Sequence, residues 1–423
     1  MTLPDIHRTI DAVWRIESAR LIASLTRLVG DVGLAEDLAQ GALVAALEQW
    51  PQSGLPDKPG AWLMATAKHH AIDQIRRNVR LERKTDEMGR DLELEQPLGV
   101  PEEMDSDDDM GDDLLRLIFI ACHPILSKDA RLALTLRLLG GLTTDEIARA
   151  FLVPEPTIAQ RIVRAKRTLS EAHVPFEVPT GSDRAARLSS VLEVIYLIFN
   201  EGYSATSGAD WVRPALCEDA LRLGRFLAEL IPNEPEVHGL VALLEIQASR
   251  LRARIGPSGE AIPLLEQNRG RWDQLLIQRG FAALLRAEAV GGALGPYRLQ
   301  AAIAACHAQA RNPEDTNWER IAALYDALAQ IAPSPIVELN RAVAVGMAFG
   351  PAAGLEIVDT LTSEPSLKTY HLLPGVRGDL LAKLGRFNEA CEEFKRAAEL
   401  TRNARERELL HERAAAMAKG GSA

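Results

Sequence analysis

The sequence predicts an all-α protein in which two small helical domains precede a longer run of helices resembling an α-solenoid. Apolar residues recur every three or four positions along most of the chain, and no stretch alternates apolar and polar residues as a strand would. Gly and Pro punctuate the helical segments. The chain has 423 residues, a length that suits about two to four globular domains. Its residues are 47% apolar and 25% charged, proportions typical of globular proteins with ordinary hydrophobic cores.

The cysteine content and the N-terminus indicate a cytoplasmic protein. Four cysteines lie far apart at Cys122, Cys217, Cys306 and Cys391, without a C-x-x-C spacing or a disulfide framework. The first residues lack a basic stretch followed by an apolar run, and no long uncharged apolar segment occurs. We therefore expect a chain that is neither secreted nor inserted in a membrane.

Three helices are expected in the first domain, residues 1–84. Apolar spacing predicts helices over residues 5–29 and 34–50, and Trp50-Pro51 is expected to end the second one. A turn-rich stretch follows, and a third helix is predicted from Ala61 to about Arg80.

Charge separates this domain from the next. Residues 85–113 hold thirteen acids and a single base, a net charge of −12, so the rest of the chain carries +1 of the total −11. Residues 68–84 hold six bases and two acids, a local charge of +4. The pattern predicts a basic element beside a flexible acidic linker, residues 85–113, with helical order resuming at Leu114.

Residues 114–173 end in a helix, a tight turn and a second helix. Thr143 and Glu146 have the spacing of a capping box, and Pro154 fits the turn. Four apolar residues of the second helix form one buried stripe: Ile158, Ile162, Ala165 and Leu169. The opposite face carries Thr157, Gln160, Arg161 and Arg164. Such a face can contact bases and phosphates in a major groove, although a solvated face of an ordinary helical hairpin would have the same composition.

The last segment, residues 174–423, reads as helical hairpins stacked in series. Gly378, Ala390, Phe394 and Ala397 have the spacing of the small and aromatic positions of a tetratricopeptide repeat. Earlier hairpins match this pattern only loosely, so the expectation of an α-solenoid depends on this one hairpin.

Taken together, these segments resemble the bacterial RNA polymerase sigma factors of the extracytoplasmic-function (ECF) type. Residues 35–43, Ala-Glu-Asp-Leu-Ala-Gln-Gly-Ala-Leu, look like the helix with which this family binds the polymerase clamp. Residues 59–77 look like the helix that melts and reads the −10 element, and the helix-turn-helix looks like the −35 reader. The runs 194–203, 295–303 and 333–342 resemble an ECF group with a long C-terminal tetratricopeptide-like extension.

The resemblance implies a subunit that binds core RNA polymerase, directs it to promoter DNA and opens the duplex without catalysis or a cofactor. The residues implied for core polymerase binding are Glu36, Asp37, Leu38 and Gln40. Those implied for −10 binding and melting are Trp62, Lys68, His69, Asp73, Arg76, Arg77 and Arg80. Those implied for the −35 element are Thr157, Gln160, Arg161, Arg164 and Lys166. The C-terminal helices are expected to regulate or assist, with a protein partner of their own.

Several of these residues also have structural interpretations. Trp62 could belong to the core, and His69 could hydrogen-bond Asp73 one turn later. Arg76 and Arg77 could simply complement the dipole at a helix end.

Three other functions would place different demands on this sequence. A zinc hydrolase would have to use Cys122-His123, Cys306-His307 or His69-His70, but adjacent residues on a helix diverge and no His-Glu-x-x-His occurs. A one-component regulator would bind an operator without polymerase and sense a ligand through the C-terminal helices. A scaffold built on the repeats would keep its partners without the first 170 residues or so.

Overall fold

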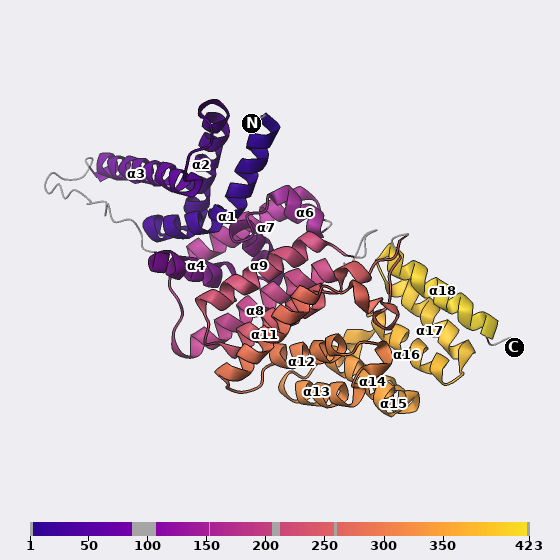
Figure 1. Cartoon of the computed structure of the whole chain (residues 1–423). Coiled ribbons are helices and arrows are strands. Elements are labelled where there is room, and N and C mark those ends of the chain that lie inside the picture. Colours follow the sequence, from indigo (N-terminus) through magenta and orange to yellow (C-terminus); the bar gives the residue numbers. More distant parts are fainter. Residues whose placement is uncertain (1–2, 87–106, 152, 205–211, 258–259, 421–423) are drawn as a thin grey trace. The chain divides into compact units, whose positions relative to one another are not determined.

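The structure, a computed structural model, describes residues 3–86, 107–151, 153–204, 212–257 and 260–420. These residues fold into helices, with no strand among them and one isolated bridge between Ile255 and Ala261. The all-α prediction is confirmed. The chain divides into two compact units, Met1–Val194 and Ile195–Ala423. Helices of both units are labelled in Figure 1. Within the described ranges, no helix is both long enough and apolar enough to cross a membrane.

Unit 1 begins with three long helices that pack on one another. They are α1 (Leu3–Val29), α2 (Val32–Ser53) and α3 (Pro59–Asp86). The carboxylate of Asp31 accepts a hydrogen bond from the backbone N–H of Leu34 and caps α2. The prediction that Pro51 ends this helix was wrong: α2 continues to Ser53, and Gly54, with a φ of 86°, ends it. Pro51 lacks the N–H that would donate to the carbonyl four residues earlier, so the helix loses that one hydrogen bond and stops two residues later.

Helix α4 (Asp107–Ala121) starts earlier than the predicted resumption of order at Leu114. Most of the expected acidic linker, residues 87–106, lies outside the described residues, but the end of that stretch is helical. Asp113 is buried and pairs with Arg27 of α1 at 3.1 Å and with Arg116 at 2.7 Å. This carboxylate therefore belongs to the packed interior, because two guanidiniums offset the cost of its burial.

Unit 1 continues with α5 (Lys128–Leu138), α6 (Thr144–Phe151), α7 (Glu155–Glu171) and the first part of α8 (Gly181–Tyr203). The predicted capping box of α6 is present: the Thr143 N–H donates to Glu146 at 2.8 Å, and the Glu146 N–H donates to the Thr143 hydroxyl at 3.1 Å. The four apolar residues predicted for the buried stripe of α7 are its buried residues. The beginning of α8 packs with this unit, since the Ser190 hydroxyl donates to the Cys122 carbonyl at 2.6 Å.

Unit 2 is a series of helices that mostly pack against their neighbours in the sequence (Figure 1). They are α9 (Pro214–Leu230), α10 (Pro235–Ala248), α11 (Gln274–Val290), α12 (Pro296–Gln309), α13 (Trp318–Ile331), α14 (Pro335–Phe349), α15 (Pro351–Leu361), α16 (Leu372–Lys383), α17 (Phe387–Leu400) and α18 (Ala404–Gly420). Short 3₁₀ turns join some of them: 251–253, 264–266, 269–271, 313–315 and 365–367. The exception to packing between sequence neighbours is α12, which packs mainly against α10 and only slightly against α11, the helix between them in the chain.

The tetratricopeptide-like spacing predicted near the C-terminus corresponds to real packing between α16 and α17. Ala390, Phe394 and Ala397 of α17 are buried in the core that α14 to α18 share. A Cβ on Gly378 would lie 2.9 Å from the Phe394 ring, closer than van der Waals contact allows. Glycine at this position therefore lets the ring lie directly on the backbone of α16.

Candidate functional site

The outer face of α7 is open. Gln160 and Arg164 are exposed, and Thr157 is half-buried at the start of the helix. Arg161 is half-buried and pairs with Asp129 of α5 at 2.9 Å. A guanidinium held by an exposed carboxylate can exchange that partner for a phosphate at small cost. Four of the five residues predicted for −35 contacts thus lie together on a helix preceded by a tight turn.

The fifth residue, Lys166, is held elsewhere. Its ammonium lies 2.5 Å from Oε2 of Glu36 on α2 and 3.9 Å from Asp37, and its side chain is largely covered. The residue predicted to bind DNA and the residue predicted to bind polymerase are therefore engaged with each other.

Glu36 is the centre of a buried charge cluster between α2, α5 and α7. Only 2% of the residue is exposed. Its Oε1 accepts hydrogen bonds from the Arg137 Nε at 2.6 Å and from the Gln40 amide at 2.5 Å. Burial raises the pKa of Glu36, but the charges of Lys166 and Arg137 outweigh it and hold this pKa below its ordinary value. The carboxylate is ionised at neutral pH and fixes α5 and α7 against α2.

The predicted polymerase-binding set on α2 is mostly turned inward. Leu38 is buried, Gln40 is half-buried and bonded to Glu36, and Asp37 is the exposed member. Helix α7 packs against α2, so this face of the helix is covered in unit 1.

Arg137 is the member of the cluster that sequence reasoning missed. It lies in the last turn of α5, where a basic residue usually complements the helix dipole, so its type gave no signal of a distant partner. It also donates to the Leu142 carbonyl at 3.1 Å, which fixes the guanidinium beside the turn that precedes α6.

A second ion pair in unit 1 joins α1 to α6. Arg15 of α1 lies 2.5 Å from Oε1 of Glu146, the carboxylate that also caps α6. The pair is partly exposed, so salt screens it and it stabilises the packing of unit 1 less than the buried Glu36 cluster does.

Helix α3 carries the residues predicted for the −10 element. Its buried stripe is formed by Leu63, Ala67 and Ala71. Trp62 lies beside this stripe, half-buried, with its ring edge-to-face against buried Trp50 at a centroid distance of 5.3 Å. The partly exposed ring is thus supported from behind by a second indole.

The polar residues of α3 face outward where they are described. His69, Asp73 and Arg76 are exposed, and Lys68 is half-buried. No hydrogen bond joins His69 to Asp73 in the described part of the chain, so the structural role considered for His69 has no support. Arg77 and Arg80 belong to α3, but their side chains lie outside the described residues.

The cysteines considered for a zinc site are all free and buried. Burial raises the pKa of Cys122 to about 11, although the hydroxyl of Thr135 lies 3.4 Å from its sulfur. Among the residues that the structure describes, no three His, Cys, Asp or Glu side chains gather as a metal site would require.

Comparisons with known proteins agree with this organisation. Family models for sigma-70 region 2 and sigma-70 region 4 match residues 15–81 and 116–169, and a family of unknown function, DUF6596, matches residues 187–288. The uncharacterized protein R00370 of Rhizobium meliloti is 43% identical over 386 residues, which cover 91% of this chain and 90% of that protein.

The probable ECF RNA polymerase sigma factor SigI of Mycobacterium tuberculosis is 27% identical over 188 residues. This alignment covers 42% of the present chain and 60% of SigI. No solved structure gives a significant match. Because the two sigma-70 regions and the C-terminal family occur in one chain, in the order that the motifs predicted, the protein belongs to the ECF-type sigma factors with a long C-terminal helical extension.

Proposed function

We propose that this sigma factor binds core RNA polymerase in the cytoplasm, directs it to specific promoters and helps to open the DNA. In this proposal Thr157, Gln160, Arg161, Arg164 and Lys166 contact the −35 element. Trp62, Lys68, His69, Asp73, Arg76, Arg77 and Arg80 contact and melt the −10 element. Glu36, Asp37, Leu38 and Gln40 bind the core enzyme. The observation that carries the proposal is the open polar face of α7 on a capped helix-turn-helix.

We further propose that α5 and α7 separate from α2 when unit 1 binds polymerase, and we call the arrangement before this separation the closed form of unit 1. Glu36 and Lys166 are both needed for contacts outside the protein, and each is occupied by the other. A partner that binds α2 must therefore separate α5 and α7 from it. Core polymerase supplies the free energy for this step through its own contacts with α2, so the −35 reader is released when polymerase is bound.

The C-terminal helical domain is proposed to regulate or assist initiation through a protein partner. Stacked helical hairpins present long concave surfaces that suit peptide segments. A truncation that tests this role should end after α8 instead of near Val174, because Ser190 holds the start of α8 on unit 1. Equal transcription by that truncation and the full chain would contradict the regulatory role.

The test of the main proposal is promoter-dependent transcription with purified core polymerase and the full chain. We expect promoter-specific transcripts that depend on both proteins. The rival function, a one-component regulator, predicts instead that the chain alone binds duplex operator DNA tightly. Polymerase would then not change the affinity for that DNA. Asp37→Ala is a suitable variant for the polymerase contact, because this side chain is already exposed and its loss leaves the core intact.

A further inference from the structure

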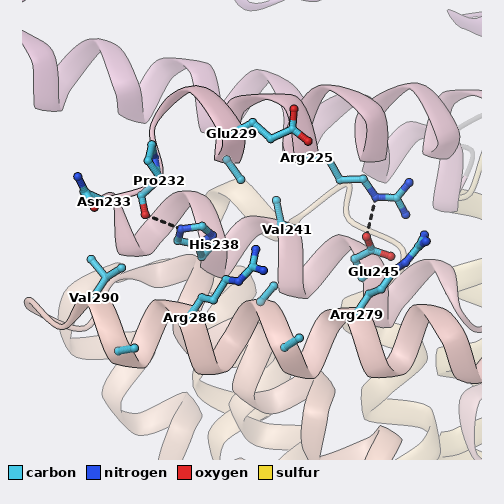
Figure 2. A pocket seen from close by; sticks show the side chains of 14 residues that line it. Arg225, Glu229, Pro232, Asn233, His238, Val241, Glu245, Arg279, Arg286 and Val290 are labelled. Atoms are coloured by element: carbon cyan, nitrogen blue, oxygen red, sulfur yellow. Dashed lines mark hydrogen bonds and ion pairs between the residues drawn. The ribbon is translucent and has the colours of Figure 1, made fainter.

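Unit 2 contains a groove of about 930 Å³ between α9, α10 and α11, shown in Figure 2. Its floor is made of small and apolar side chains, including Ala282, Ala283 and Val241. Charged side chains stand along its rims. The sigma-70 regions do not include this groove, which lies in unit 2 at residues 225–290.

One rim carries two guanidiniums that are available to a ligand. Arg279 and Arg286 are exposed and extend from α11 toward the other two helices in Figure 2. Among the described residues, neither has a hydrogen-bond or ion-pair partner. They are two helical turns apart, so they can hold two anionic groups about 10 Å from each other.

The other side of the groove holds a carboxylate that is only half satisfied. Glu245 is 2% exposed, and its Oε1 accepts a hydrogen bond from the Arg225 Nε at 2.7 Å. This hydrogen bond is the largest cause that raises the pKa of Arg225. The second oxygen, Oε2, is buried without a hydrogen-bond partner. A buried acceptor left unpaired in this way costs free energy that a donor from an occupant would recover.

The three features together describe one kind of occupant. Two separated guanidiniums call for two carboxylates, the apolar floor calls for aliphatic side chains, and the unpaired oxygen of Glu245 calls for an N–H group. An acidic peptide supplies all three, because its backbone brings N–H donors while its side chains bring the carboxylates. A free inorganic anion would meet neither the spacing of the arginines nor the floor.

We propose that this groove binds an acidic peptide segment of a protein partner, with its carboxylates on Arg279 and Arg286. The inference rests on the proposed function in one respect, that the C-terminal helical domain takes a protein partner, and it names the face and the chemistry of that partner. Glu229, on the rim formed by α9, repels further carboxylates there and so sets which side of the groove the acidic side chains occupy.

The test uses the full chain and a short fluorescein-labelled peptide in which glutamates alternate with leucines. We expect saturable binding in fluorescence anisotropy that weakens as salt is raised. The double variant R279E/R286E should weaken binding about tenfold or more, because it replaces both attractions with repulsions. Both positions are exposed, so the variant should keep the fold, which its unfolding temperature verifies.

The matched control is R396E/R402E, the same change of charge at two exposed arginines outside the groove. Equal weakening by the control, no binding of the peptide, or binding of a single-stranded oligonucleotide in its place would each overturn the inference. The readout is separate from transcription. If the chain fails to direct polymerase while the peptide still binds through α11, the proposed function fails and the groove assignment stands.

Discussion

Helices α2 and α7 both carry surfaces predicted to contact a partner, but unit 1 leaves the surface of α7 exposed and covers that of α2. The outer face of α7 leaves Gln160 and Arg164 in solvent, whereas the corresponding face of α2 buries Glu36 and Leu38. The difference follows from charge, because the cations of α5 and α7 find a carboxylate on α2 in the absence of polymerase. The acidic face of α2 that is predicted to bind polymerase thus pairs with basic residues of the protein itself.

The comparison also separates two kinds of charged residue. Arg161 pairs with an exposed carboxylate, a contact worth about 0 to 1 kcal/mol. Glu36 is buried between two cations, where loss of one partner leaves a charge in a poorly solvated place. Predictions that remove single charges should therefore give large effects at the α2 contact and smaller ones on the open face of α7.

The largest effect is expected from Arg137→Ala. Removing one partner of a buried ion pair costs about 3 kcal/mol. Here the loss destabilises the closed form of unit 1, in which α5 and α7 cover α2. Energy transfer between dyes at Glu48 of α2 and Ser170 of α7, both exposed, should report a longer distance. Affinity for core polymerase should rise about tenfold or more, because less free energy is then needed to release Glu36.

Two further variants make this prediction specific. Arg137 also donates to the Leu142 carbonyl, so Lys166→Ala, in which that bond remains, should open the unit in the same direction. Arg167→Ala removes an exposed cation of α7 that pairs with Glu171 and should change nothing. Unchanged energy transfer in both Arg137→Ala and Lys166→Ala would mean that the cluster does not control the closure.

The next effect concerns the open face of α7. Arg164→Ala should weaken binding of the holoenzyme to −35 promoter DNA by about 1 to 2 kcal/mol and reduce its salt dependence, since a phosphate or base contact is lost. Arg161→Ala should give a similar loss, less the small cost of releasing Asp129. Substitution of Gln160 should instead relax the sequence preference. Loss of folding in these variants, measured by circular dichroism, would favour a structural role for the face.

A third prediction tests whether unit 2 affects these two surfaces. Gly378→Ala places a Cβ 2.9 Å from the Phe394 ring and should destabilise unit 2 by about 1 to 3 kcal/mol. Gly375→Ala, on the same helix, meets nothing within 4 Å and should be neutral or slightly stabilising. Thermal unfolding measures both. If transcription falls only with Gly378→Ala, the C-terminal helices assist initiation, and if it is unchanged they do not.

The local parts of this picture could be predicted from the sequence. The capping box at Thr143, the turn at Val153-Pro154 and the buried stripe of α7 depend on residues within a few turns of one another. Periodicity and capping are local signals, so the helix-turn-helix and its outer face were found correctly. The burial of Phe394 against Gly378 was also visible, because repeat spacing encodes contact between adjacent helices.

What could not be predicted depends on residues far apart in the chain. Glu36 and Arg137 are separated by 101 positions, and nothing in their spacing indicates that they meet. Asp113 looked like one of thirteen solvated acids and is instead buried beside Arg27, because folding places a guanidinium where the carboxylate would otherwise be unpaired. Arg225 and Glu245 of the groove lie on different helices and likewise carried no local signal.

The smallest effect expected is a dependence of the closure on pH, and its sign follows from Glu36. Its pKa lies below the ordinary value of 4.5 when α2 is covered, because Lys166 and Arg137 outweigh the effect of burial. A carboxylate with a lowered pKa stabilises the closed form while it is ionised. This contribution is complete above pH 4.5 and is lost as the pH falls through the lower value of the closed form.

Energy transfer between the dyes on α2 and α7 should therefore be constant at neutral pH and fall in the acid range. Glu406 of unit 2 also has a lowered pKa, because its hydrogen bonds to His371 and Thr401 outweigh the effect of burial, so acid weakens unit 2 in the same range. Glu36→Gln distinguishes the acid effect at α2 from the acid effect on unit 2, because it removes the titrating carboxylate of α2 and leaves Glu406 unchanged. A variant whose α2 to α7 distance keeps the acid dependence of the natural chain would show that another group, not Glu36, holds the two helices together.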